Sequence, residues 1–400
     1  MMTLELHVWG PGFGLPSIDA ECLGAIAYLR YCLPEDAWKI VASNDPKGCP
    51  LGELPALKDG DQWVSRFNSI VAYLRGLSNV DWDLDGSLGG AQKADCFAFT
   101  SFIESRGQPL LDLSFYVSSE NYNDSTKRAL SQVLTWPGSW TIPGKLRDKA
   151  KKRSEHLGLS SLDVGAALED AKTKDTGLTA QIPERLRSPK QTVSALLGKN
   201  AAKDRFRLDA VTAEFMEPIE ELLGQKEQLL SKDVTSLDCL AIGYLALMQR
   251  HDLPQDWLRD ALRKKYPRLG QWSDTFAQTT FERPLPWIAL GPVTGSERIL
   301  AIVETLVGAL PVVGRNYASI ELPETVSSTE KASYATKQNA IRDLRQKQRH
   351  FYQIMLSSLG FGTFIGYMLW AGLLVLPRPA AKPSRRDFGA AGAMLGLGLR

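Results

Sequence analysis

The chain has 400 residues, of which 44% are hydrophobic and 23% charged, and its formal net charge at pH 7 is +2. This composition is typical of a globular protein and excludes a chain that is disordered throughout. The length predicts two domains with appended segments. A net charge so close to zero gives no signal for nucleic-acid binding, and we expect no nucleic-acid partner.

The five cysteines are widely spaced, and no two of them form a CxxC pair. This pattern gives no support to a zinc site or a dithiol redox centre, and it is typical of reduced thiols in a cytosol-facing protein. The first ten residues, MMTLELHVWG, contain neither a basic region nor an apolar run. They therefore do not resemble a secretory signal or a mitochondrial presequence.

The first 80 residues predict a thioredoxin-like domain. Alternating and apolar patterns predict strands at 4–9, 38–42, 54–57 and 62–64, and helices at 18–33 and 69–74. Ser17 is the expected N-cap of the first helix. Asp59-Gly60 predicts the turn of a hairpin, and Leu54-Pro55 stands where this fold carries a cis-proline.

Residues 91–340 predict an all-α second domain. Strand signals fade after residue 91, and helical patterns continue to about residue 349. We expect a polar insertion at about 145–205, in which 145–153 holds six basic residues and one acid and is interpreted as a solvated loop. A helix is expected at 257–265, with the segment YPRLGQW at its end. Further helices are expected at 206–230, 240–248, 296–310 and 331–349.

Thr235 and Asp238 predict a structural N-cap. They have the S/T-x-x-D spacing of a reciprocal capping pair and precede the apolar run 240–248. In such a pair, each side chain accepts a hydrogen bond from a backbone N–H at the start of the helix.

The C-terminal region predicts a membrane helix. Residues 351–376 contain no charged side chain, and a bilayer core needs about 20 apolar residues in a helix. Gly362 and Gly366 form a GxxxG pair, which suits close helix contact within the membrane. Four basic residues flank the run on each side, so their balance does not orient the span. The basic tail 377–400 follows, and a buried core helix is the alternative to a span.

These features together resemble a known family. The segments that show the resemblance are VWGPGFGLPSIDAECL, SNDPKGCPLGELPAL, the Ile70-x-x-Tyr73-Leu74 helix, the TSLD box and YPRLGQW. Their order is similar to that of metaxin-related proteins with a glutathione-transferase-like fold, over residues 4–80 and 205–280. The chain resembles in particular the larger metaxin-related subunit of the fungal mitochondrial sorting and assembly machinery (SAM). The implied fold is α+β, with a thioredoxin-like domain, an all-α transferase-like domain and a C-terminal membrane helix.

The resemblance also implies where glutathione chemistry would lie. Glutathione-binding transferases carry a Glu-Ser pair that falls on Arg66-Phe67 here. The positions that activate the thiol fall on Trp9 and on Leu15, just before Pro16. Arg66 and Phe67 cannot accept the ammonium group of glutathione, and neither Trp9 nor Leu15 can supply or stabilise a thiolate. Ser17 is the one nearby hydroxyl, and we interpret it as a helix cap.

Other catalytic patterns are also missing from the sequence. The four histidines lie far apart, and GPGFG lacks the spacing of a phosphate loop. Asp81, Asp83 and Asp85 alternate like part of a calcium loop, but the rest of that pattern is absent, so we interpret them as a solvated linker. We therefore expect no catalytic residue, no cofactor and no metal.

The sequence thus predicts a non-catalytic scaffold at the mitochondrial outer membrane, with its folded domains facing the cytosol. The resemblance implies a role in β-barrel protein insertion. The implied partners are the β-barrel core subunit of the SAM complex, a second metaxin-like subunit, the general import pore, precursor β-barrel proteins and the lipid bilayer. The alternatives are a membrane-anchored glutathione-dependent enzyme and a translation-factor-like interaction module.

Overall fold

A computed structural model describes residues 3–43, 49, 52–77, 82–134, 136, 138–159, 193–249, 253–288 and 371, with the backbone alone for 193–204. The chain divides into two units, Met1–Arg345 and Gln346–Arg400. Of the second unit only Ala371 is described, and it is exposed. Everything below concerns the first unit.

The described strands form one five-stranded sheet in the order β4-β3-β1-β2-β5. The strands are β1 (Leu4–Trp9), β2 (Trp38–Ser43), β3 (Ala56–Asp59), β4 (Gln62–Ser65) and β5 (Trp287–Ile288). β1 pairs parallel with β2 and antiparallel with β3, and β3 and β4 form the hairpin expected around Asp59-Gly60. The Leu54-Pro55 bond is cis. The thioredoxin-like prediction is therefore confirmed for β1 to β4.

β5 was not predicted from the sequence. It follows the helical half of the chain and pairs parallel with β2 at Ile40 and Val41. The Ile40 N–H also donates to the Pro286 carbonyl at 2.8 Å. This two-residue strand returns the chain to the edge of the N-terminal sheet.

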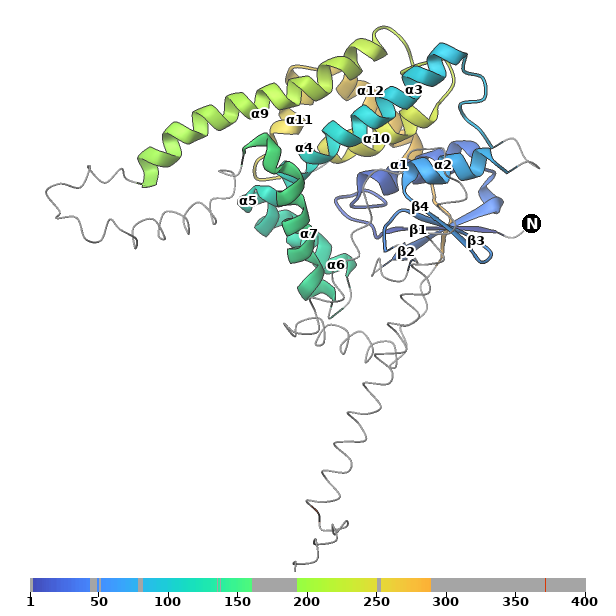
Figure 1. Cartoon of the computed structure of the whole chain (residues 1–400), viewed down its shortest axis with the longest axis horizontal. Helices are drawn as coiled ribbons and strands as arrows, with labels where there is room; N and C mark the ends of the chain where they lie inside the picture. The colour runs from blue at the N-terminus through green and yellow to red at the C-terminus, as the bar shows by residue number, and fades with distance from the viewer. Residues whose placement is uncertain are drawn as a thin grey trace, which may run out of the picture. The chain divides into compact units, whose positions relative to one another are not determined.

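Two helices cover one face of the sheet, α1 (Ala20–Cys32) and α2 (Phe67–Arg75) (Figure 1). Leu4, Leu6 and Val8 alternate along β1 and are buried. The expected N-cap at Ser17 is wrong. Asp19 caps α1, because its carboxylate accepts the Cys22 N–H at 3.0 Å, while Ser17 lies two residues too early and accepts the Asp19 N–H.

The second half of the described chain is almost entirely helical, as the sequence predicts. After the sheet come α3 (Gly90–Phe102), α4 (Gln108–Asp112), α5 (Ser119–Asn121), α6 (Lys127–Val133), α7 (Gly138–Ser154), α9 (Val193–Leu223), α10 (Ser236–Gln249), α11 (Trp257–Lys264) and α12 (Pro267–Phe281). π-Helical turns at Ile103–Gly107, Leu113–Val117 and Tyr122–Thr126 join the segments between α3 and α6. Short 3-10 turns lie at Glu35–Ala37 and Glu155–Leu157.

Two expectations about these helices are wrong. The YPRLGQW segment does not end a helix: Pro267 opens α12, where its missing N–H leaves no bond unmade. The basic run 145–153 is not a loop. It forms the C-terminal half of α7, and Pro143, Ala150 and Ser154 give that helix a buried face. The far end of the expected insertion, from Val193, already belongs to α9.

Several expectations concern residues that the structure does not describe. These are the middle of the insertion at 160–192, the helices at 296–310 and 331–349, the span at 351–376 and the tail. Gly362 and Gly366 belong to this group. Among the helices of the described residues, none is long and apolar enough to cross a bilayer.

The helix α10 is buried along its whole length and crosses α1 at close range. Gly24 on α1 and Gly243 on α10 permit this approach. A Cβ on Gly243 would overlap the Ala20 carbonyl oxygen, and one on Gly24 would lie 3.2 Å from the Cys239 carbonyl oxygen. The larger of two hydrophobic clusters among the described residues runs from the sheet through α1 into the helical half.

Candidate functional site

The positions that correspond to a glutathione site are closed by the protein's own side chains. Trp9, Leu15 and Ser17 are 9%, 3% and 0% exposed. An indole and an isobutyl group therefore occupy the positions that the family resemblance assigns to the thiol-activating group, and the nearby Ser17 hydroxyl is buried. No nucleophile at these three positions reaches solvent.

The N-terminus of α2 is occupied by a carboxylate from α1. Glu21 accepts the Phe67 N–H at 3.4 Å through Oε2, and its Oε1 lies 3.5 Å from the Arg66 guanidinium. Arg66 has a φ of 73°, and its N–H donates to the Pro55 carbonyl at 2.9 Å. A helix N-terminus attracts anions because its N–H groups are unpaired. Here an internal carboxylate satisfies that attraction.

A second carboxylate lies beside the same pair. The Asn68 amide donates to Glu104 at 2.7 Å. Burial and the nearby Glu21 charge raise the pKa of Glu104 to about 7, while Arg66 acts in the opposite direction. The charge of Glu21 raises the pKa of the Arg66 guanidinium. The result is an ion cluster (Glu21, Arg66, Asn68 and Glu104) between the first helices of the two halves of the chain.

Thr235 and Asp238 exchange hydrogen bonds at the start of α10. Asp238 accepts the Thr235 N–H at 2.8 Å and the Thr235 hydroxyl at 2.6 Å, and its other oxygen accepts the Leu229 N–H at 2.8 Å. The Asp238 N–H donates to the Thr235 hydroxyl oxygen at 3.4 Å. Both residues are completely buried. Burial raises the pKa of the Asp238 carboxyl, and these hydrogen bonds oppose the rise.

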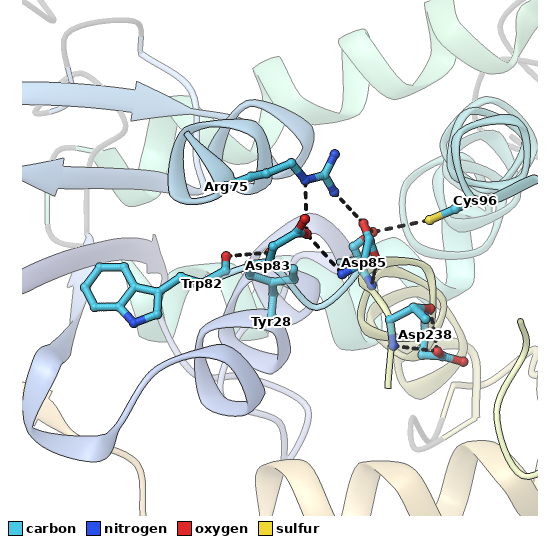
Figure 2. A network of polar contacts seen from close by, with 9 residues as sticks. Tyr28, Arg75, Trp82, Asp83, Asp85, Cys96 and Asp238 are labelled. Carbon is cyan, nitrogen blue, oxygen red and sulfur yellow. Dashed lines mark hydrogen bonds and ion pairs between the residues drawn. The ribbon is translucent and has the colours of Figure 1, made fainter. Parts of the chain in front are cut away.

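The linker between α2 and α3 reaches the same helix start, and this corrects the interpretation of Asp83 and Asp85 as a solvated linker (Figure 2). Asp85 is 4% exposed and accepts the Ser236 N–H at 2.9 Å and the Ser236 hydroxyl at 2.6 Å. Arg75 bridges the two carboxylates, at 3.0 Å from Asp83 and 2.6 Å from Asp85. Asp83 also accepts the Asp85 N–H at 3.0 Å. Asp85 therefore binds the start of α10, and Asp83 supports it through Arg75 and the Asp85 N–H, while Asp81 lies outside the described residues.

Two further groups extend this network. The Cys96 thiol lies 3.4 Å from the Ser236 hydroxyl, and burial raises its pKa. The Tyr28 hydroxyl donates to the Trp82 carbonyl at 3.3 Å. The network thus joins α1, α2, the linker, α3 and α10 (Figure 2), and it contains no exposed nucleophile.

A buried ion pair was missed by sequence reasoning. Asp112, at the end of α4, is fully buried and receives two hydrogen bonds of 2.9 Å from Arg153 of α7. Burial raises the pKa of the Asp112 carboxyl, and Arg153 opposes the rise. In the sequence, Arg153 is one of six basic residues within 145–153, so no local signal distinguishes it from the lysines beside it.

No metal site is formed by the part of the chain that the structure describes, since no group of three His, Cys, Asp or Glu side chains is suitably placed there. The described arrangement therefore offers packing, capping and ion pairs.

Comparison with known proteins gives a consistent family. A family model described as "Tom37: Outer mitochondrial membrane transport complex protein" matches residues 22–147. Metaxin-1 of Bos taurus is 26% identical over 267 residues, which cover 65% of this chain and 70% of that protein. Metaxin-1 of Mus musculus is 31% identical over 156 residues, with 38% and 47% covered. Metaxin-3 of Danio rerio is 23% identical over 300 residues, with 72% and 82% covered.

Solved structures were compared as well. The apo form of glutathione S-transferase III is 13% identical, with 81% of this chain and 100% of that chain covered and a TM-score of 0.35. A glutathione S-transferase of Ceriporiopsis subvermispora in complex with glutathione is 13% identical, with 73% and 100% covered and a TM-score of 0.40. Scores this low add nothing to what the sheet topology shows.

The β4-β3-β1-β2 sheet with its cis-proline, followed by a helical half packed through α10, defines a glutathione-transferase-like protein. The Bos taurus and Danio rerio metaxins reported above are similar to 65% and 72% of this chain. The family model and these relatives together support a metaxin-family protein.

Proposed function

We propose that the chain is a non-catalytic subunit of the SAM complex of the mitochondrial outer membrane. It assists the insertion and assembly of β-barrel proteins through protein–protein contacts. Similarity to the metaxin family supports this role, because the matching family model describes an outer mitochondrial membrane transport complex protein.

One observation carries the non-catalytic part of the proposal. The carboxylate of Glu21 lies on the Phe67 N–H and beside Arg66, at the helix start that holds the γ-glutamyl end of glutathione in related transferases. A ligand carboxylate would have to displace Glu21 and then share the site with a second acid, Glu104. Repulsion between the ligand carboxylate and the ionised form of Glu104 would oppose binding.

The partners follow from the family. We propose contacts with the β-barrel core subunit of the SAM complex and with a second metaxin-like subunit, and further contacts with the general import pore and precursor β-barrel proteins. The folded domains face the cytosol in this proposal. Because fold alone does not fix function, these contacts are the part that experiment must establish.

We also propose that residues 351–376 anchor the chain, with Gly362 and Gly366 as a helix-contact surface. These residues lie outside the described part of the structure. Alkaline carbonate should leave the full-length chain in the membrane pellet and extract a chain truncated after Arg349. Equal extraction of the two chains would mean that the run is not an anchor.

The rival function is a membrane-anchored glutathione-dependent enzyme. Millimolar glutathione should not raise the melting temperature of the full-length chain in detergent, whereas a ligand at about 100 times its Kd stabilises by about 2.7 kcal/mol. No conjugation of glutathione to a general electrophile is expected. Turnover that disappears in Ser17→Ala would establish the enzyme and refute the scaffold.

A further inference from the structure

The start of α7 carries two tryptophans that stand in solvent. Trp140 is 86% exposed and Trp136, just before the helix, is 61% exposed. Indole rings are mostly buried in folded proteins, because each contributes a large apolar area. The other two strongly exposed aromatic side chains, Phe97 and Phe206, lie on α3 and α9, and neither has a second exposed aromatic side chain within four residues along its helix. Among the described residues, Trp136 and Trp140 are therefore the one pair of exposed aromatic side chains that lie within four positions of each other.

Lysines follow these rings along the same helix. Lys145, Lys149 and Lys152 are exposed and have the spacing i, i+4 and i+7, which places them on one face. Pro143, Ala150 and Ser154, which face the protein, occupy the opposite side. Trp140 stands five residues before Lys145, so it projects from a different side of the helix than the lysines, at the exposed start of α7. We call Trp136, Trp140 and these three lysines the α7 surface.

The charges around this surface are mainly positive. Asp148 is the one acid among residues 138–154, and it is exposed between the lysines. The two arginines of the same run are engaged elsewhere. Arg153 pairs with Asp112, and Arg147 donates to the Tyr116 carbonyl at 3.0 Å and stacks over the Tyr122 ring. The three lysines therefore supply the exposed positive charge, with Glu155 at the far end of the helix.

The surface lies at the end of a helical pair. α6 and α7 run beside each other, and the short connection between them carries Trp136 (Figure 1). A helix rises about 1.5 Å per residue, so Lys145 lies about 8 Å and Lys152 about 18 Å from Trp140 along the axis. If the start of α7 touches a flat surface, the indole rings would therefore contact that surface first, and the lysines would lie progressively farther from it.

We propose that the α7 surface docks on an anionic phospholipid bilayer. The indole rings enter the boundary between headgroups and acyl chains, Lys145 lies nearest the lipid phosphates, and the positive charges of Lys149 and Lys152 attract the anionic surface from farther along the helix. Tryptophan is enriched at this boundary because one edge of its ring is apolar and its N–H is polar. A basic helix with aromatic residues at one end is typical of interfacial binding, and lysines near a surface are attracted to anionic lipid.

An acidic protein is the competing occupant. Such a partner would pair with the lysines but would also need a separate pocket for each exposed ring. A bilayer interface accepts both kinds of side chain without a specific pocket, so the combination favours lipid. The inference does not depend on which transport complex the chain serves, nor on the anchor at 351–376.

The test uses the full-length chain reconstituted into phosphatidylcholine vesicles with or without about 30% anionic phospholipid. The emission of Trp136 and Trp140 is obtained as the difference between the wild-type chain and Trp136→Ser/Trp140→Ser. Brominated phospholipids should quench this difference emission in anionic vesicles. The quenching should be lost in pure phosphatidylcholine, and in about 1 M salt, where the Debye length falls to about 3 Å.

A charge variant supplies a second arm. Lys145→Glu/Lys149→Glu/Lys152→Glu should lose the same quenching in anionic vesicles. The matched control is Lys93→Glu/Phe97→Ser, an exposed lysine and aromatic residue four apart on α3, which should leave it unchanged. Unchanged melting curves would show that the variants fold, as expected for exposed positions.

Two results would overturn the proposal. One is difference emission that brominated lipid does not quench at low salt in anionic vesicles. The other is quenching that persists in the triple lysine variant, which would mean that the lysines do not recognise the lipid. The competing occupant would give a distinct form of the first result. Lipid quenching would be absent in the wild-type chain, and an acidic protein that co-purifies with the wild type would be lost from the triple lysine variant. The α7 surface would then bind protein, and the proposal would be wrong.

Discussion

Asp85 accepts two hydrogen bonds from Ser236, one from its backbone N–H at 2.9 Å and one from its hydroxyl at 2.6 Å. The two residues are 151 positions apart in the chain. Their contact attaches the linker after the thioredoxin-like sheet to the start of the central helix α10. The two halves of the chain therefore share a polar connection in addition to their common core.

Asp85→Ala should destabilise the protein substantially. The change leaves a buried N–H and a buried hydroxyl of Ser236 without an acceptor and removes one partner of Arg75, at a cost of about 2–4 kcal/mol. Urea unfolding of the full-length chain in detergent, followed by far-UV circular dichroism, measures the effect. Asp95→Ala, at an exposed position of α3, is the control and should fall within about 0.5 kcal/mol of wild type. Equal midpoints for the two variants would refute the connection.

Asp238→Ala should also exceed the cost of an ordinary helix cap. A lost cap typically costs about 1–2 kcal/mol. Asp238 is completely buried and also accepts the Leu229 N–H, so we expect about 2–4 kcal/mol. Asp238→Asn retains a side-chain oxygen that can accept one of these bonds and should lose less. The same urea experiment ranks the variants, and an alanine variant that matches wild type would show that the cap is dispensable.

These two acids show what could be predicted from the sequence. Thr235 and Asp238 lie three residues apart, so a local spacing rule identifies their pairing. Asp85 and Ser236 are brought together only by the packing of α10 on α1, and nothing near Asp85 in the sequence indicates that it is buried. The interpretation of Asp83 and Asp85 as solvated failed for this reason.

The same distinction applies to the fold. β1 to β4, α1 and α2 follow from alternation, helical periodicity and the Asp59-Gly60 turn, all of which are local. β5 has two residues, and its pairing with Ile40 depends on where α12 ends. The basic residues of α7 looked like a loop because its buried face uses a proline, an alanine and a serine in place of large apolar side chains.

Gly243→Ala should weaken the contact between α1 and α10. The added Cβ would overlap the Ala20 carbonyl oxygen, and backbone atoms cannot move aside as a flexible side chain can. We expect a loss of about 1–3 kcal/mol, typical of overpacking. Gly144→Ala on α7 is the control, because its Cβ would have no neighbour within 4 Å and alanine favours the helix. A Gly243→Ala chain as stable as wild type would show that the two helices do not cross closely.

Glu104 should make stability depend on pH. Its pKa is raised from 4.5 to about 7, so the folded chain holds a proton that the unfolded chain releases at lower pH. The contribution of Glu104 is therefore fully present below about pH 4.5 and is lost as the pH rises towards 7. Glu104→Gln removes this dependence, so its stability relative to wild type should increase across that window.

The measurement is the free energy of unfolding at several pH values between 4 and 8, with Glu221→Gln on the exposed side of α9 as the control. The control should run parallel to wild type over the whole range. If Glu104→Gln also runs parallel to wild type, then Glu104 titrates at the same pH in both states, and the ion cluster does not perturb it.

The central claim is that this metaxin-family chain acts through protein contacts in the SAM complex. Affinity purification of the tagged full-length chain from detergent-solubilised mitochondria, followed by mass spectrometry, tests it most directly. The account predicts that the β-barrel core subunit and a second metaxin-like subunit are recovered in amounts comparable to the chain itself. Recovery of the chain without either subunit would contradict the account.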